Sequence, residues 1–206
     1  KNASDEQIKE ICEKYWNNSI VRRYYIDICK KNKEYDHVLQ ILDECILLDK
    51  QYRDLISEYS KKKKEIYLLQ GNKSAYIEQL WQLVLDYEAG DLDLYRELKK
   101  QYSTDEWLIK REEIFKKLPA NAHVERLYKE EKLYDRLLTY VLNSPGLYAL
   151  EEYERVLKKD YPEQILGKYS EEVNKMAMYT SDRKHYAYLV SLLRKMQYLK
   201  GGVALV

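Results

Sequence analysis

Residues 130–162 read EEKLYDRLLTYVLNSPGLYALEEYERVLKKDYP and predict two amphipathic helices joined by a tight turn. Between the two helices, Asn143 can adopt the left-handed conformation, Ser144 can cap the next helix and Pro145 suits its first position. Pro162 marks the following boundary, because proline cannot continue a helix but can open one. Each helix carries apolar residues three and four positions apart, on one face: Tyr134, Leu137, Leu138 and Val141, then Leu147, Leu150, Tyr153 and Leu157.

A hairpin with one apolar stripe on each helix needs a neighbouring pair to bury both stripes. Aligned on the 34-residue tetratricopeptide template with Glu130 first, the stretch places Tyr140, Ala149 and Tyr153 on matching template positions. The match is partial, because Leu137 stands where the template has a small residue. We therefore expect an all-α, tetratricopeptide-like αα-hairpin array (α-solenoid) of about 11–12 helices. A helical pair at residues 1–33 is expected to continue into the array at residues 34–202.

The start of one helix is repeated later in the chain. Residues 33–39 read KEYDHVL and residues 132–138 read KLYDRLL, an offset of 134 − 35 = 99 residues. This offset is close to three tetratricopeptide periods and indicates a duplicated hairpin.

Capping residues and further stripes locate other helices. Ser4 with Gln7 and Ser103 with Glu106 fit the capping box, and residues 180–182 are expected to break and recap the chain. Asp91 can cap the helix that follows it. Near the N-terminus, two stripes are expected to share a face of their helix: Ile8, Ile11, Cys12 and Tyr15, then Ile20, Tyr24 and Ile28.

Composition excludes several classes of protein. With 45% hydrophobic and 34% charged residues, the chain is too apolar for a disordered protein and too charged for a membrane protein. It has no apolar run near 18 residues and no signal peptide. Three cysteines without a C-x-x-C pair predict a reducing, cytoplasmic location. Because the chain begins at Lys1 and not at Met, we expect it to be a piece of a longer protein.

Tyrosine is over-represented, with 22 residues against a single phenylalanine. A tyrosine can bury its ring while its hydroxyl stays wet, which suits a thin two-layer array. The alternative is a tyrosine-rich binding face. The positions of many tyrosines on the apolar stripes favour the structural interpretation.

Two basic regions are the candidates for nucleic-acid contact. Glu58 and Glu65 flank the first region, which favours a solvated helix face over a binding site. The second lies in the last predicted helix, where cations are favoured near the C-terminus in any case. A net charge of +1 argues against a strong general attraction to nucleic acid. The candidate residues are Lys61, Lys62, Lys63 and Lys64, and Arg183, Lys184, Arg194 and Lys195.

No catalytic, cofactor-binding or metal-binding residue is predicted. His37, His123 and His185 are far apart in sequence and lie in no zinc-type spacing. The sequence around Gly71 and Lys73 lacks the first glycine of a phosphate loop, and no G-x-S-x-G or G-x-G-x-x-G occurs. We therefore expect a protein that is not an enzyme and holds no cofactor.

Several short stretches carry distinctive packing and charge patterns: GDLDLYREL at 90–98, EW at 106–107 with RE at 111–112, LYKEEKL at 127–133, RKHY at 183–186 and LLR at 192–194. Together, over about residues 36–202, they resemble the C-terminal helical region of bacterial SWIM zinc-finger proteins. It implies a soluble bacterial protein in which a zinc finger precedes a helical array. The finger has the form C-x-C and C-x-H, which this chain lacks, so no zinc ligand carries over. The matched residues Trp107, Arg111, Tyr128, Arg183 and Tyr186 are expected to hold adjacent hairpins together.

Two hypotheses for function follow. The first is a non-catalytic protein–protein interaction or scaffold module, part of a larger SWIM-like protein, which binds a partner's helix or extended segment in a groove. The second is an accessory module that supports nucleic-acid binding by a finger outside this chain. That hypothesis requires the two basic regions to share one face.

Overall fold

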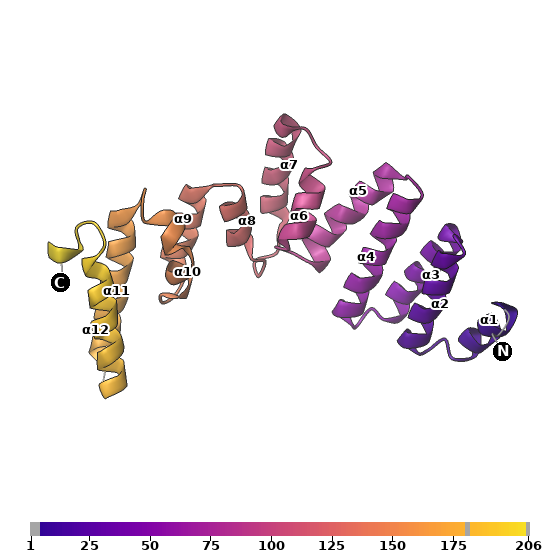
Figure 1. The fold of residues 1–206 in the computed structure, drawn as a ribbon, viewed down its shortest axis with the longest axis horizontal. Coiled ribbons are helices and arrows are strands. Elements are labelled where there is room, and N and C mark those ends of the chain that lie inside the picture. The colour runs from indigo at the N-terminus through magenta and orange to yellow at the C-terminus, as the bar shows by residue number, and fades with distance from the viewer. Residues whose placement is uncertain (1–4, 180–181, 205–206) are drawn as a thin grey trace. The chain divides into compact units, whose positions relative to one another are not determined.

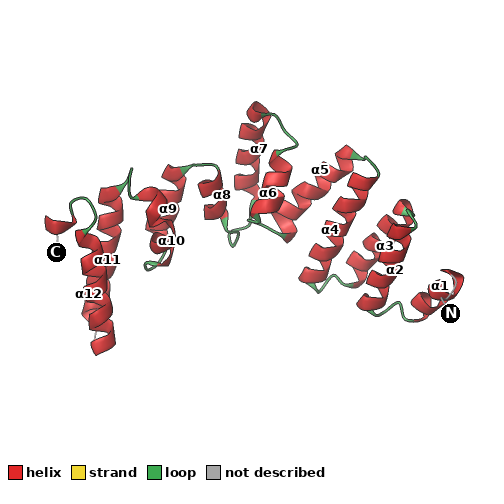
Figure 2. Cartoon of the chain, viewed as in Figure 1, coloured by secondary structure: helices red, strands yellow, loops and turns green. Residues whose placement is uncertain are grey.

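The computed structural model describes residues 5–179 and 182–204. Twelve α-helices and no strand form within these residues, and the chain is 78% helical, which confirms the predicted all-α class (Figure 2). The helices are α1 Asp5–Lys14, α2 Ser19–Lys31, α3 Tyr35–Leu48, α4 Arg53–Leu69, α5 Lys73–Gln82, α6 Leu92–Lys99, α7 Thr104–Lys117, α8 Val124–Glu130, α9 Tyr134–Asn143, α10 Tyr148–Leu157, α11 Pro162–Tyr179 and α12 Arg183–Gln197, with a π-helix η1 at Leu83–Tyr87 and a 3-10 turn η2 at Gly202–Ala204.

The helices form two compact units, Lys1–Val124 and Glu125–Val206 (Figure 1). The predicted helical pair at residues 1–33 falls inside the first unit, and its continuation into a repeat array over residues 34–202 stays a prediction. In the first unit each helix from α1 to α6 contacts the next, and α7 contacts η1. The core of its first four helices combines aliphatic residues, two tyrosines and three cysteines: Ile26, Val38, Ile41, Leu42 and Ile66, with Tyr25 and Tyr59, and with Cys12, Cys29 and Cys45.

The first stripe predicted near the N-terminus lies only partly on the buried face of its helix, and the second lies off it. In the first stripe, Cys12 is buried and Ile8 packs against the core, but Ile11 of α1 and Tyr15, directly after α1, are 55% and 54% exposed. In α2, Ile20 and Tyr24 are 66% and 57% exposed. The buried face of α2 consists instead of Arg22, Tyr25, Ile26 and Cys29.

The second unit confirms the apolar faces of the hairpin at residues 130–162. Leu137 and Val141 of α9 and Leu150 and Leu157 of α10 are fully buried in one core. Helices α9, α10 and α11 contact one another, and α11 contacts α12. Pro162 opens α11 as expected.

The connection inside this hairpin differs from the prediction. Ser144 follows the last residue of α9 as its C-cap, and its hydroxyl donates to the Tyr140 carbonyl at 2.8 Å. Gly146 takes the left-handed conformation predicted for Asn143, with φ +67°. Helix α10 therefore begins only after a short loop, at Tyr148.

Side-chain caps fix several helix starts. Ser103 and Glu106 form the predicted capping box, and Asp91 and Asp182 accept hydrogen bonds from the first backbone N–H groups of α6 and α12. Ser4, of the other predicted capping box, lies outside the described residues, as do Thr180 and Ser181. Because these caps satisfy otherwise unpaired N–H groups, they stabilise the helix ends.

The 99-residue echo in the sequence corresponds to one repeated turn. Lys33 and Lys132 are the two non-glycine residues with positive φ in the described chain, at 64° and 57°. In the first turn, the Glu34 N–H donates to the Cys29 carbonyl at 2.9 Å and the Lys33 N–H to the Lys30 carbonyl at 3.0 Å. The second turn repeats these bonds from Leu133 to Tyr128 and from Lys132 to Lys129. Both are Schellman turns that close a helix before the next one begins.

Replacing Lys33 by glycine is expected to stabilise the first unit by about 0.5–1 kcal/mol, because a side chain in the left-handed region costs energy that glycine avoids. The measurement is urea unfolding followed by tryptophan fluorescence. Trp16, Trp81 and Trp107 are the only tryptophans, and all lie in the first unit. The matched control is Lys31→Gly in the last turn of α2, which is expected to destabilise by about 1 kcal/mol. A loss of stability in Lys33→Gly would contradict the argument.

Candidate functional site

The four consecutive lysines of α4 form ion pairs in four directions. Successive residues of an α-helix point about 100° apart, so the run encircles the helix and does not form one basic face. Each ammonium meets a carboxylate from a different segment: Lys61 pairs with Glu88 after η1, Lys62 with Asp27 of α2 at 2.9 Å, Lys63 with Asp43 of α3 at 2.6 Å, and Lys64 with Glu97 of α6 at 2.7 Å.

The expectation of a solvated face is therefore wrong for this run. The side chains of Lys63 and Lys64 are only 14% and 16% exposed. The sequence offered a partial signal in the flanking Glu58 and Glu65, but these bind Arg23 and Lys30 of α2 instead. Because each lysine already has an acidic partner, the run connects α4 to its neighbours. Nucleic-acid contact through it stays a prediction.

Glu97 receives two of these cross-links. Lys64 donates to one of its oxygens at 2.7 Å, and the Tyr76 hydroxyl donates to the other at 2.5 Å. Burial by itself would raise the pKa of the Glu97 carboxyl, but the hydrogen bonds from Lys64 and Tyr76 outweigh burial, and the pKa lies below its ordinary value. Glu88, beside Lys61 and Ser57, has a lowered pKa for the same reasons.

These carboxylates predict acid-sensitive stability in the first unit. A carboxyl whose pKa is lower in the folded chain stabilises it above the ordinary value of 4.5, and this contribution is lost as pH falls through the folded pKa. We expect the free energy of unfolding to fall below about pH 4.5, measured by urea unfolding with tryptophan fluorescence. Glu97→Gln should be less stable at neutral pH and show a shallower acid decline. An unchanged decline would contradict the assignment to Glu97.

The basic residues of α12 differ from the lysine run. Arg183, Lys184 and Arg194 are exposed, and none forms an ion pair within the described part of the chain. Lys195 is held by Glu154 at 2.9 Å, with its ammonium 5.1 Å from the centre of the Tyr169 ring. The lysine run belongs to the first unit and α12 to the second, so the shared face that nucleic-acid binding would require stays a prediction.

Tyrosine hydroxyls join helices by donating to carboxylates. The donor–acceptor pairs are Tyr59–Asp49 at 2.7 Å, Tyr76–Glu97 at 2.5 Å, Tyr161–Asp135 at 2.5 Å and Tyr169–Glu154 at 2.7 Å. The structural interpretation of the tyrosines therefore holds for this set. Others have exposed rings: Tyr15, Tyr24, Tyr52, Tyr148, Tyr179, Tyr186, Tyr188 and Tyr198.

A buried ion pair lies among the first four helices of the first unit. Arg22 is 1% exposed, donates to the Trp16 carbonyl at 2.6 Å and pairs with Asp49. The Tyr59 hydroxyl donates to the same Asp49 oxygen at 2.7 Å. The cluster links α2, the end of α3 and α4. It lies in the interior, and we assign it to stability.

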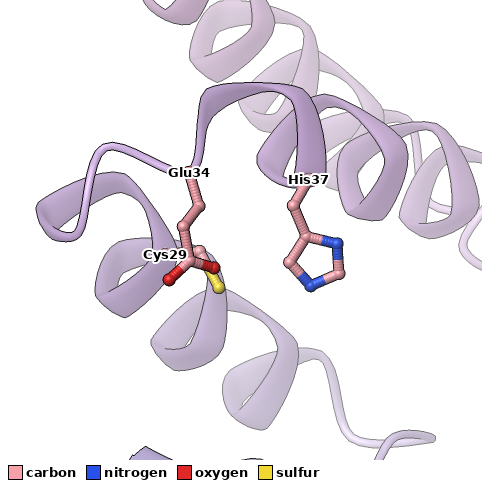
Figure 3. Close-up of side chains that lie close together, drawn as sticks. All are labelled: Cys29, Glu34 and His37. Atoms are coloured by element: carbon pink, nitrogen blue, oxygen red, sulfur yellow. The ribbon is translucent and has the colours of Figure 1, made fainter.

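Cys29, Glu34 and His37 come together at the first Schellman turn (Figure 3). Cys29 lies in the last turn of α2, Glu34 precedes α3 and His37 lies in its first turn. Their potential ligand atoms all lie within 4.8 Å of one another. The Tyr25 ring stands edge-on to the His37 ring, with the two ring centres 6.0 Å apart.

The Cys29 thiol is not activated as a nucleophile. Burial raises its pKa, and the negative charge of Glu34 raises it further. A catalytic cysteine needs a lowered pKa, because the thiolate is the reactive form. The cluster therefore offers atoms that could bind a metal ion, but its cysteine is not activated for nucleophilic attack.

No family, curated protein or solved structure matches this chain in the comparisons made. In the parts of the chain that the structure describes, no helix has both the length and the apolar character needed to cross a membrane.

The Cys29 cluster was not predicted from the sequence, because its spacing, C-x4-E-x2-H, spans a turn and matches no zinc pattern. The sequence feature that could have located the turn is the repeat of residues 33–39 at residues 132–138. A cavity of about 410 Å³ adjoins His37, and its walls include Glu13, Trp16, Tyr25 and Glu44.

Proposed function

We propose that this chain is a non-catalytic protein-interaction module, built as a tetratricopeptide-like array of helical hairpins. The observation that carries the proposal is a set of exposed apolar residues on α1 and α2, two helices in contact. Ile11 lies in the last turn of α1 and Tyr15 directly follows that helix, while Ile20 and Tyr24 lie one turn apart on α2. Each of the four is more than half exposed.

Exposed apolar groups of this kind favour a protein partner. Tyrosine and isoleucine at a helix surface gain energy when a partner removes them from water, and tyrosine supplies large contact area with few rotatable bonds. Single exposed apolar residues are ordinary, but four of them on one pair of contacting helices offer a partner more apolar area than one would. The partner that fits is a protein that presents an apolar helix or extended segment.

The alternative is a module that assists nucleic-acid binding, and α12 supports it through its exposed Arg183, Lys184 and Arg194. The nearly neutral net charge of +1 and the paired lysines of α4 count against it. A larger SWIM zinc-finger-like protein in a bacterial cytoplasm is the context that we propose for the module. That context rests on the sequence resemblance alone.

Affinity capture with two baits tests the proposal. The first bait is the unchanged chain, and the second carries Ile11→Ser, Tyr15→Ser, Ile20→Ser and Tyr24→Ser. Lysate halves with and without nuclease are compared by mass spectrometry. We expect proteins that survive nuclease and are lost with the second bait. A control bait with Leu108→Ser and Ile109→Ser, exposed at 48% and 71%, should retain them.

Proteins retained equally by all three baits would overturn the assignment to α1 and α2. A different outcome would support nucleic-acid binding through α12 instead. In that case the captured partners would be lost after nuclease treatment, and they would also be lost with a bait that carries Arg183→Glu and Arg194→Glu.

A further inference from the structure

We propose that Cys29, Glu34 and His37 form a binding site for a divalent zinc ion. Thiolate, carboxylate and imidazole are the three ligand types of protein zinc sites. Three protein ligands leave a fourth tetrahedral position for water or another donor. Of the described residues, this is the one cluster with cysteine, histidine and carboxylate ligand atoms close enough to share an ion.

The backbone positions the three ligands. The bond from the Glu34 N–H to the Cys29 carbonyl, 2.9 Å long, holds the two residues together across the turn. His37 follows Glu34 by three residues, nearly one helical turn, which places it on the same side of α3. Figure 3 shows all three side chains gathered on the inner side of the turn.

The distances fit an ion after a small adjustment. Zinc–ligand bonds of about 2.0–2.3 Å set tetrahedral ligand atoms about 3.5 Å apart. The atoms here are separated by at most 4.8 Å, so they need to approach by about 1 Å. Glu34 is exposed and can supply most of this movement by rotating its side chain.

One side of the site is packed and another is open to solvent. The Tyr25 ring stands edge-on to the His37 ring, with the ring centres 6.0 Å apart, and limits the rotation of this ligand. The side chain of Glu34 is exposed, so an ion can reach the cluster from solvent.

The second Schellman turn serves as an internal comparison. It forms with the same backbone bonds, but Tyr128, Leu133 and Arg136 stand where the first turn has Cys29, Glu34 and His37. The turn therefore needs none of the three ligand types for its own stability. The three ligand types occur together only in the first of these two turns, where Cys29 also packs in the core and Glu34 accepts a hydrogen bond from Asn32 at 3.3 Å.

The test is a titration of the whole chain, reduced and free of metal, with Co²⁺ as a spectroscopic probe and Zn²⁺ as its competitor. We expect one equivalent of Co²⁺ to produce a thiolate charge-transfer band that Zn²⁺ removes. Glu34→Gln and His37→Gln should weaken Zn²⁺ binding at least about tenfold, and Cys29→Ser should abolish the band. Cys45→Ala, a buried thiol outside the cluster, is the control and should bind as the unchanged chain does.

Glu34→Gln keeps the test decisive if Cys29→Ser fails to fold, because Glu34 is exposed and its replacement leaves the core intact. Circular dichroism of each variant verifies its fold. The absence of a thiolate band at one equivalent would overturn the site. So would a band that survives Cys29→Ser, or unchanged Zn²⁺ affinity in Glu34→Gln and His37→Gln.

Discussion

Asp49→Ala is expected to destabilise the first unit by about 3–5 kcal/mol, because it leaves the Arg22 charge buried without a partner. Arg22 is 1% exposed, and Asp49 also accepts the hydroxyl of the buried Tyr59. The substitution therefore removes an ion pair and orphans a second donor. Urea unfolding followed by tryptophan fluorescence measures the loss, since all tryptophans lie in this unit.

Asp27→Ala is the matched control for Asp49→Ala. Its carboxylate pairs with Lys62 but is 63% exposed, so we expect a loss below about 1 kcal/mol. Replacing both partners, as Arg22→Met with Asp49→Leu, should recover much of the stability, because no charge is left buried. Equal losses in Asp27→Ala and Asp49→Ala would show that water relieves the Arg22 charge.

Tyr169→Ala is expected to destabilise the second unit by about 3–5 kcal/mol, the range for removing a fully buried aromatic ring. Tyr169 is 0% exposed in the core of that unit, and its hydroxyl donates to Glu154 at 2.7 Å. Hydrogen exchange of the α9–α12 amides measures the effect, since this unit contains no tryptophan.

Tyr169→Phe separates packing from hydrogen bonding. It keeps the ring and removes one hydrogen bond, for which we expect a loss of about 1 kcal/mol. Glu154 keeps Lys195 at 2.9 Å, which limits that loss. Tyr148→Ala, at a ring that is 81% exposed, should change stability by less than about 0.5 kcal/mol. Protection factors in Tyr169→Ala that equal those of Tyr148→Ala would contradict the packing argument.

The helices were predictable where aliphatic residues dominate their buried face. In α9 and α10 the period of Leu137, Val141, Leu150 and Leu157 identified the core directly, because the buried residues of these two helices include no charged side chain. The same reasoning chose the wrong face of α2. There Arg22 is buried, and its burial depends on Asp49, 27 residues away in sequence.

The prediction of a solvated face at Lys61–Lys64 was wrong for a related reason. A run of like charges predicts a solvated face only if no carboxylates approach it from neighbouring helices. The partners of Lys62 and Lys63 lie 35 and 20 residues away, so local sequence did not reveal them. The Cys29 cluster depends on a left-handed Lys33, and lysine gives no local signal of that conformation.

Site-specific photocrosslinking tests directly whether the exposed residues of α1 and α2 bind a protein partner. A photoreactive benzoylphenylalanine replaces Tyr24, 57% exposed on α2, and in a second protein it replaces Tyr148, 81% exposed in the other unit. After irradiation in a lysate, we predict crosslinks to a discrete protein from position 24 and none to that protein from position 148. Crosslinks to nucleic acid from position 24, or the same protein from both positions, would contradict an interaction module centred on α1 and α2.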